Sequence, residues 1–562
     1  MAEPLKIVFL VGRIDANGLN AVARVCELQG VKVLAVMVDT AAPGSGERWR
    51  NLKRNVRREG LSYLPHRAVL AVKKRLENWA DRVIPTREVD ELLDQAFPHR
   101  NFKRLAQQAG FRIVKAGNLN GPRAVEGLKS LQPDLGVVLG TRVLKRPLFS
   151  VPRLGCINLH KGRVPEYRGM PPGFWELFDG KDSAGVTVHF VDDGLDTGDV
   201  VGDVTVPIHP KETPESLKAK LDEAGTDLLV ETIEQIQRGT AVRRPQPRTA
   251  QKARTRPTRA QRNELARRLP HWRRLGDGRQ AIKAAVWLGL FHSGLYGLIR
   301  RLRKGTSRGA ILLYHRVNDA SADVLTASTR RFAEHLVVLR HYYRSIATDD
   351  LLERVASHKP IEPTSVAIHF DDCYRDVRTF AAPLLAAAGV PAVAFISSGF
   401  VDSDRVFLHD EDKYPQRFAN LRSEDLKQLP ALGVAIAAHT VNHADLGTVS
   451  LEQAGVEVIE SRRQLEEVMG RPVLLFSFPF GKISNIREEV RQMVAGAGYR
   501  ALFSAGGGFV DQNTALLDVP RFGVSSDHSP LALMMELEGI SLEHFRYWLR
   551  GRFRRQGSRP AP

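Results

Sequence analysis

Residues 155–169 read GCINLHKGRVPEYRG, and this stretch indicates the fold of the first half of the chain. An apolar run ends in Asn158 and His160, and a loop with Pro165 and Gly169 follows it. Side chains two apart on a strand point to the same face. In a doubly wound parallel sheet, ligands bind beyond the carboxyl ends of the strands. We therefore expect the amide and the imidazole to lie together at such an edge.

The first 240 residues alternate apolar runs with amphipathic stretches. Strand-like runs occur at residues 7–11, 31–38, 112–116, 135–139 and 186–191. Amphipathic stretches such as 21–29 and 123–131 lie between them. This alternation predicts an α/β domain with a Rossmann-like, doubly wound parallel sheet.

An acidic loop with two glycines follows the strand-like run at 186–191. It reads DDGLDTGD over residues 192–199. A carboxylate beside an imidazole can orient the ring, and a carboxamide N–H can stabilise an oxyanion, so the combination suits acyl transfer to an amine. Taken alone, Asn-x-His at a strand end is more often structural, and the acidic loop is equally consistent with a surface turn.

Residues 157–201 resemble the signature of the 10-formyltetrahydrofolate-dependent formyltransferases, the family of methionyl-tRNA and sugar N-formyltransferases. The stretch reads INLHKGRVPEYRGMPPGFWELFDGKDSAGVTVHFVDDGLDTGDVV. The resemblance implies that Asn158 stabilises the oxyanion, that His160 takes the amine proton and that Asp196 orients His160. It also implies that Asp196 and Gly198 contact the cofactor, 10-formyltetrahydrofolate.

Two features depart from that family. Lys161, Gly162 and Arg163 stand where the family has a small polar stretch, and we expect them to alter recognition of the substrate or of its phosphate. The chain also passes from a predicted helix at 214–237 into a basic segment, with no small β-barrel of the kind that grips tRNA. Formylation of charged tRNA is therefore disfavoured.

The second half repeats the strand–loop–helix pattern with different polar residues. Strand-like runs occur at residues 310–314, 365–370, 392–397, 434–438, 473–478 and 500–504. This spacing predicts a distorted (β/α) barrel, with its working residues at the carboxyl ends of the strands. Polar residues follow the strands at those ends: His315, Asp371, Asp372, His439 and His443.

These residues suggest a metal site. Adjacent acids on an extended strand point in opposite directions, so only one of Asp371 and Asp372 joins a cluster unless the strand has begun to turn. One carboxylate with His439 and His443 gives three protein ligands for a divalent ion, with zinc expected. The other carboxylate is then free to act as a base. Alternatively, the histidines are solvated at a helix start, and the paired acids belong to a turn.

This half resembles the polysaccharide deacetylases of carbohydrate esterase family 4. The motifs that carry the resemblance are LLYHRV at 312–317, HFDDCYRD at 369–376, HTVNH at 439–443 and FPFG at 478–481. The resemblance implies that Asp371 is the base, that His315 is the general acid and that the loop 479–481 lines the sugar site. The metal ligands that it implies are Asp372, His439 and His443.

Three features depart from the deacetylase pattern. Cys373 stands where the family has glycine, which raises the question of thiol interference. Ser477 or Phe478 occupies the place of an arginine that supports the base in many relatives. A late Leu-x-His motif is represented only by residues 542–544.

The net charge of +19 is concentrated in one segment. Residues 241–308 hold 19 Lys and Arg against two acidic residues, so almost all of the excess lies there. No stacking or base-reading motif accompanies this charge, so we do not expect nucleic-acid binding. Residues 280–304 contain an apolar run too short to span a bilayer, followed by a basic cluster. An interfacial helix on an anionic membrane and a helix packed between domains are equally favoured.

The expected organisation has four parts. These are a formyltransferase domain at 1–240, a basic linker with an amphipathic helix at 241–305, a deacetylase domain at 306–545 and a basic tail at 546–562. The three cysteines show no disulfide or zinc-knuckle spacing, and the first residues show no secretory-signal pattern. We therefore expect a cytoplasmic protein, with peripheral attachment to the inner face of the membrane as the additional hypothesis.

A formyltransferase consumes an amine, and a deacetylase of this type releases one. The sequence therefore predicts a bifunctional enzyme of amino-sugar or glycan biosynthesis that combines metal-dependent N-deacetylation with N-formylation of a sugar amine. One alternative is formylation followed by deformylation of a lipid-linked amino sugar. The other is a membrane-docked sugar-binding or scaffold protein with one inactive domain.

Overall fold

The chain folds into two compact units. The computed structural model describes residues 3–12, 15–42, 49–50, 52–56, 84–98, 101–210, 212–247, 249–269, 289, 291–303, 306–319, 324–411, 418–482, 485–526 and 528–540. Unit 1 takes its described residues from 3–56 and 97–269, and unit 2 takes them from 84–96 and 289–540. The Leu-x-His candidate at 542–544, the tail at 546–562 and residues 280–288 lie outside the described part.

Unit 1 is built on a seven-stranded sheet in the order β3-β2-β1-β4-β5-β6-β7. The strands are β1 Leu5–Val11, β2 Val31–Asp39, β3 Arg112–Gly117, β4 Leu135–Leu139, β5 Cys156–His160, β6 Ser183–Phe190 and β7 Val200–Pro207. The first five pair in parallel, as predicted, whereas β6 and β7 are antiparallel to their neighbours. The sheet therefore has a Rossmann-like part and an antiparallel edge that begins beside β5.

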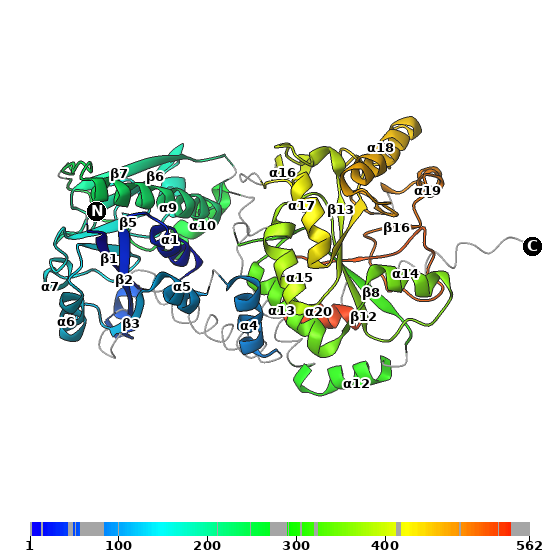
Figure 1. The fold of residues 1–562 in the computed structure, drawn as a ribbon, viewed down its shortest axis with the longest axis horizontal. Coiled ribbons are helices and arrows are strands. Elements are labelled where there is room, and N and C mark those ends of the chain that lie inside the picture. The colour runs from blue at the N-terminus through cyan, green and yellow to red at the C-terminus, as the bar shows by residue number, and fades with distance from the viewer. Residues whose placement is uncertain are drawn as a thin grey trace, which may run out of the picture. The chain divides into compact units, whose positions relative to one another are not determined.

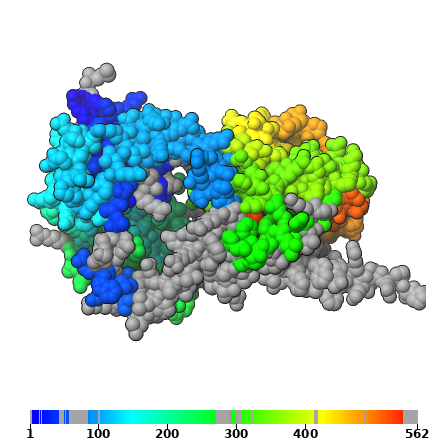
Figure 2. Space-filling model, turned by 90° about the horizontal axis from the view of Figure 1, so that it is seen from below, coloured from blue at the N-terminus to red at the C-terminus, as the bar shows by residue number. Residues whose placement is uncertain are grey.

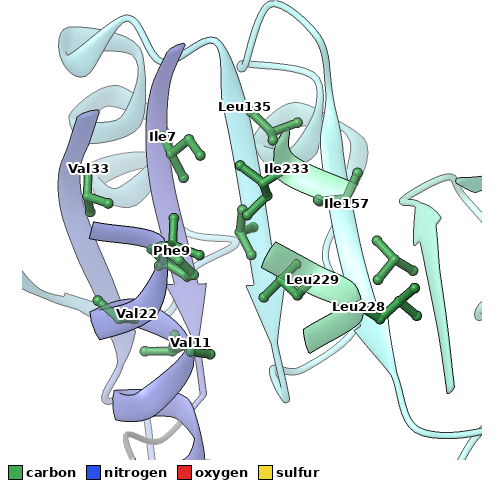
Figure 3. Packing of buried hydrophobic residues seen from close by; sticks show 14 of the residues in the cluster. Ile7, Phe9, Val11, Val22, Val33, Leu135, Ile157, Leu228, Leu229 and Ile233 are labelled. Carbon is green, nitrogen blue, oxygen red and sulfur yellow. The ribbon is translucent and has the colours of Figure 1, made fainter. Parts of the chain in front are cut away.

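The strands of unit 1 send alternate side chains into two cores. Ile7 and Phe9 face the core formed with helices α1 and α9, whereas Val8 faces the core formed with α6 and α7. These helices span Ala16–Cys26 (α1), Pro122–Leu131 (α6), Arg146–Phe149 (α7) and Pro214–Arg238 (α9). Figure 3 shows Leu229 and Ile233 of α9 against the first core. Packing on both faces holds the carboxyl ends of β4 and β5 at one edge.

Three further helices of unit 1 lie later in the sequence than α1. They are α5 Phe102–Ala109, α8 Phe174–Phe178 and α10 Arg259–Arg268. Leu265 of α10 packs on Phe174 and Trp175 of α8. Residues 243–269, which the sequence analysis assigns to a linker, thus lie on unit 1 and form part of its structure.

Unit 2 is built on an eight-stranded sheet whose main path is β16-β15-β14-β13-β12-β8-β17, with β11 also paired to β12. The strands are β8 Gly309–Tyr314, β11 Arg344–Ser345, β12 Ser365–Phe370, β13 Ala392–Ile396, β14 Val434–Ala438, β15 Leu475–Ser477, β16 Ala501–Phe503 and β17 Phe522–Gly523. All described pairs in this sheet are parallel. In the described part of the chain, β16 and β17 lie at the two ends of the path and do not pair with each other. The sheet is therefore an incomplete barrel, which agrees with the predicted distorted (β/α) barrel.

Helix α4 (Thr86–Ala96) belongs to unit 2 although the segments before and after it contribute to unit 1. It packs against α13 (Thr329–Tyr342) and α15 (Ala382–Ala388). Val89 and Leu92 are its buried residues. Figure 1 shows α4 beside α13 and α15. Unit 2 is therefore discontinuous in sequence.

Helix α12 (Leu295–Arg303) lies within the predicted amphipathic segment 280–304 and is shown in bright green in Figure 2. Tyr296 is buried, and its hydroxyl lies 3.4 Å from that of Tyr343 in unit 2. Leu298 is exposed. Among the described residues, no helix combines the length and the apolar character needed to cross a membrane. Contact of 280–304 with a membrane surface stays a prediction.

Candidate active sites

Strand β5 carries the predicted Asn-x-His pair at its carboxyl end. Antiparallel pairing with β6 places Asn158 opposite His189 and His160 opposite Thr187. Asn158 Nδ2 lies 3.2 Å from His189 Nε2 and 3.4 Å from Asp196 Oδ1. His160 Nδ1 lies 3.5 Å from Asp196 Oδ2. The structure thus brings the three predicted residues together and adds His189 to them.

Hydrogen bonds fix the protonation of both rings. His160 Nε2 lies 2.8 Å from the Tyr167 carbonyl, which can only accept, so the neutral ring carries its proton on Nε2 and its lone pair on Nδ1. By the same argument, His189 Nδ1 donates to the Phe190 carbonyl and Nε2 accepts from Asn158. Burial lowers the pKa of His160 and outweighs the opposing effect of the nearby carboxylate. His160 therefore offers Nδ1 as a proton acceptor.

Asp196 lies in the loop after β6 with φ of +55°, a conformation that is uncommon for residues other than glycine. Its Oδ2 accepts the Gly169 N–H at 3.0 Å. Burial acts to raise the pKa of Asp196, but its contacts with His189 and His160 outweigh burial and lower it. The carboxylate is therefore charged at neutral pH and faces both imidazoles.

Two glycines leave no room for a side chain near this group. A Cβ on Gly162 would lie 2.7 Å from His160 Nε2 and 2.4 Å from the Tyr167 carbonyl oxygen. A Cβ on Gly198 would lie 2.0 Å from the Phe190 carbonyl oxygen. Both positions therefore need glycine for close packing. The predicted contact of Gly198 with the cofactor stays a prediction.

Lys161 and Arg163, the two cations in the stretch that differs from the formyltransferase family, both have protein partners. Lys161 forms an ion pair with Asp222, which also accepts from Lys218 Nζ at 2.6 Å. Arg163 Nη2 donates to Thr205 Oγ1 at 2.6 Å. A role for either cation in phosphate recognition stays a prediction.

A second cluster forms at the carboxyl ends of β12 and β14. Asp372 follows β12, and His439 and His443 follow β14. His443 Nε2 lies 3.1 Å from Asp372 Oδ1, and His439 Nε2 lies 3.7 Å from the same oxygen. Ligand atoms of the three residues all lie within 4.8 Å of one another. The structure thus brings the predicted metal ligands together.

The chemistry of this cluster fits a divalent ion. His439 Nδ1 donates to the Ser477 carbonyl at 2.8 Å, so its Nε2 lone pair is directed toward Asp372. Burial lowers the pKa of His439 to about 4, which keeps the ring neutral, as a ligand must be. Asp372 Oδ2 is buried and accepts no hydrogen bond from the described residues. Two imidazoles and a carboxylate form a donor set that zinc favours.

Backbone turns explain why both adjacent acids reach this centre. Asp372 has φ of +79° and His443 has φ of +55°. Such conformations are rare outside glycine and are concentrated at functional sites. Because the chain has left the extended conformation at Asp372, Asp371 Oδ2 also lies 3.9 Å from His439 Nε2.

Asp371 is held by a buried arginine from a distant part of the sequence. Arg521, just before β17, donates to both carboxylate oxygens of Asp371 at 2.7 Å. It also donates to Ser477 Oγ at 2.6 Å. Burial acts to raise the pKa of Asp371, but Arg521 and then His439 outweigh it and lower the pKa. Arg521 therefore pairs with Asp371 from a distant part of the sequence, whereas Ser477 and Phe478 stand where the deacetylase pattern has an arginine.

Replacing Arg521 by methionine is expected to destabilise unit 2 by about 3–5 kcal/mol near neutral pH, because the buried carboxylate loses its counter-ion. The pKa of Asp371 is lower in the folded state than in the unfolded state. Its stabilisation is therefore present above the unfolded pKa and is lost as the pH falls through the folded pKa. Urea unfolding of both proteins should show a smaller difference in acid than at neutral pH. An equal difference at both pH values would contradict this account.

His315 and Cys373 border the same centre. The buried Nδ1 of His315 has no hydrogen-bond partner among the described residues. His315 also contributes to lowering the pKa of both Asp371 and Asp372, which places it near them. Burial raises the pKa of the Cys373 thiol far above its ordinary value, so the thiol stays protonated. Among the described residues, the ligand atoms that converge on the cluster come from Asp372, His439 and His443, and Cys373 is not one of them.

Two further side chains lie against the metal cluster. His409, on α16 (Leu408–Glu411), has its Nε2 3.7 Å from Asp372 Oδ2 and 3.0 Å from the Tyr374 hydroxyl. The Phe480 ring lies 4.9 Å from that of His443, and 46% of Phe480 is exposed. The loop 479–481 therefore borders the cluster, where an exposed aromatic face is available to a ligand.

The sequence analysis missed His189, Arg521 and His409. His189 carries a usable signal, because it lies near the end of the predicted strand 186–191, directly before the acidic loop that holds Asp196. Arg521 and His409 carry none, since a single polar residue outside a recognisable motif is ordinary. Their positions follow from long-range packing alone.

Two family models match the chain. One, described as Formyl transferase, matches residues 83–233, and the other, described as Polysaccharide deacetylase, matches residues 358–502. The methionyl-tRNA formyltransferase of Thermodesulfovibrio yellowstonii is 33% identical over 145 residues, which are 26% of this chain and 47% of that protein. The methionyl-tRNA formyltransferase of Citrifermentans bemidjiense is 36% identical over 141 residues, which are 25% of this chain and 44% of that protein. The chain thus spans just under half the length of these curated relatives.

Similarity to a solved structure covers part of the chain. The Streptococcus pyogenes deacetylase PplD in complex with acetate aligns at 20% identity and a TM-score of 0.35, over 41% of this chain and 98% of that chain. The formyl transferase match falls on unit 1 except for residues 83–96, which belong to unit 2. The deacetylase match falls on the part of the chain that carries the second cluster. The chain therefore carries one segment that matches the Formyl transferase model and, later in the sequence, one segment that matches the Polysaccharide deacetylase model.

Proposed function

We propose that this protein is a bifunctional enzyme that removes an N-acetyl group from an amino sugar and transfers a formyl group to the resulting amine. The proposal rests on one observation. Each half holds its own cluster of buried catalytic-type residues, and the amine released by one reaction is the nucleophile of the other. We infer that an acetamido sugar, carried by a nucleotide or a lipid, is the substrate.

In formyl transfer, the donor is 10-formyltetrahydrofolate and the amine nitrogen attacks its formyl carbon. His160 Nδ1 accepts the amine proton, because the hydrogen bond from Nε2 to the Tyr167 carbonyl leaves the lone pair of the neutral ring on Nδ1. Asn158 Nδ2 stabilises the oxyanion through the proton that makes only a 3.4 Å contact with Asp196. The C–N10 bond then breaks, and the proton passes to N10 of the folate. Asp196 holds the imidazolium that forms in between.

In deacetylation, Asp371 takes a proton from the attacking water, and Arg521 keeps its carboxylate oriented and charged. Asp372, His439 and His443 would hold the divalent ion, which lowers the pKa of water and polarises the acetyl carbonyl. His315 donates a proton to the leaving amine. The products are acetate and a free amino sugar.

The proposed partner is an amino-sugar substrate that is nucleotide-linked, lipid-linked or part of an oligosaccharide. We place the reactions in the cytoplasm, where the folate donor is made, with residues 280–304 as the segment that would contact an anionic membrane surface. Liposome flotation of the intact chain and of a variant lacking 280–304 tests that contact. Equal flotation of both would remove the membrane proposal.

The order of reactions is tested with one mixture. The protein and 10-formyltetrahydrofolate are incubated with a panel of amino sugar nucleotides, each supplied in its N-acetylated and its free-amine form, and the products are followed by mass spectrometry. Loss of acetyl and gain of formyl on the same sugar supports deacetylation first. Formylation of a free amine followed by its removal supports the reverse order. No change in any acetylated or free amino sugar supports a binding protein instead.

Removing divalent metal is expected to abolish deacetylation and to leave formyl transfer unchanged. The reason is that only the second cluster has the donor set of a metal site among the described residues. Dialysis against a chelator, followed by separate assays of acetate release and formyl transfer, measures this. Zinc should restore activity to the native chain and should fail to restore His439→Ala. Parallel loss of both activities would contradict the assignment.

A further inference from the structure

The segment that follows α9 returns along unit 1 to the acidic loop at residues 192–199, which we call the catalytic loop from here on. We call residues 243–256 the strap; its sequence is RRPQPRTAQKARTR. Pro245 and Pro247 flank Gln246, and proline favours extended backbone both at its own position and at the residue before it. The sequence therefore predisposes this part of the strap to run as a stiff, extended chain.

One end of the strap pairs with β7. The backbone N–H groups of Arg244 and Val200 each donate to the other's carbonyl at 2.8 Å. The Arg243 guanidinium lies 3.6 Å from the centre of the Phe190 ring, and Arg244 forms an ion pair with Asp203. This end is thus fixed to the strands on either side of the acidic loop.

The other end of the strap pairs with the loop that contacts Asp196. Arg254 N–H donates to the Arg168 carbonyl at 2.7 Å, and its own carbonyl accepts from Met170 N–H at 3.1 Å. Gly169, which lies between Arg168 and Met170 in the sequence, donates its N–H to Asp196 Oδ2. A Cβ on Gly169 would lie 2.1 Å from the Arg254 carbonyl oxygen, so the two chains are in close contact.

Gln246 contacts the catalytic loop directly. Its Nε2 donates to the Asp196 carbonyl at 3.2 Å and to the Gly198 carbonyl at 2.6 Å. The strap therefore holds Asp196 in two ways. Gln246 fixes its main chain, and Arg254 fixes the loop that donates to its carboxylate.

We propose that the strap is part of the formyl-transfer site and that Gln246 is a positioning residue for Asp196. This rests on the formyl transfer proposed above. A shift of Asp196 would change its 3.5 Å contacts with His160 and His189, and would leave other parts of the site in place. Displacing a catalytic group by about 1 Å can cost roughly a hundredfold in rate.

The test compares Gln246→Ala and Gln246→Glu with Gln251→Ala. The glutamate variant keeps the length and loses the donor, and Gln251 is an exposed glutamine of the same strap, so its variant is the matched control. We expect both Gln246 variants to lower kcat for formyl transfer by about 10- to 100-fold with KM nearly unchanged. Gln251→Ala should keep the native kcat. A native kcat in Gln246→Ala, or activity lost only in proportion to folded protein, would overturn the proposal.

A second measurement does not depend on the reaction. The NMR signal of the His160 ring, assigned by its loss in His160→Ala, should shift in Gln246→Ala and stay in place in Gln251→Ala. An unshifted signal would overturn the positioning role even if formyl transfer is confirmed. A shifted signal with no formyl transfer by the native chain would support the role and reject the proposed reaction.

Discussion

Asparagine in place of Asp371 should lower the kcat of deacetylation by about a thousandfold, because a carboxamide cannot accept the proton of the attacking water. The substitution keeps the size of the side chain and an oxygen that accepts from Arg521. It also leaves the proposed metal ligands Asp372, His439 and His443 unchanged. Formyl transfer should remain at its native rate, since that site lies in the other unit.

Acetate release, metal content and thermal unfolding should be measured on the same sample. Zinc bound at the native ratio, with acetate release lost, would assign the proton transfer to Asp371. Asp372→Asn is the matched comparison, because it removes a ligand and should lower metal content as well. Deacetylation within tenfold of native in Asp371→Asn would exclude Asp371 as the base.

Alanine in place of His160 should lower the kcat of formyl transfer by about 10²- to 10⁴-fold, the usual contribution of a general base. The effect should be largest near neutral pH, where the native imidazole is neutral because burial lowers its pKa. Deacetylation should be unaffected. A discontinuous assay of formylated product, with the free amino sugar supplied, separates this step from deacetylation.

The control for this variant is His209→Ala, which changes an exposed histidine in the turn before α9. Native activity in the control and loss in His160→Ala would assign the proton transfer to the ring on β5. If the pH profile of residual activity in His160→Ala keeps the native acid limb, another group accepts the proton, and His189 is the neighbour to test next.

The sequence predicts the parts of each site that lie on one short stretch. Asn158 and His160 are two apart on a strand, and His439 and His443 are four apart in a loop, so local rules place each pair together. The link from His160 to Asp196 was carried by family resemblance. Parallel strands with buried faces were predictable from their long apolar runs.

Contacts across a long sequence separation were not predictable. His189 meets Asn158 only through the register of an antiparallel pair, and Arg521 reaches Asp371 across 150 residues. Composition alone marks residues 243–256 as a solvated basic linker, yet the hydrogen bonds of Gln246 and Arg254 are formed by backbone geometry that composition does not encode. The antiparallel direction of β6 and the packing of residues 243–256 on the acidic loop depend on the whole fold.

The place of α4 in unit 2 also affects how the chain folds during synthesis. Its partners α13 and α15 begin more than 230 residues later. At about 5–20 residues per second, the ribosome needs at least 10 s to make them, and Val89 and Leu92 have no permanent partner in that time. A nascent chain of this protein therefore presents an apolar helix surface that chaperones can bind, and a fragment starting at residue 306 would leave the complementary surface open.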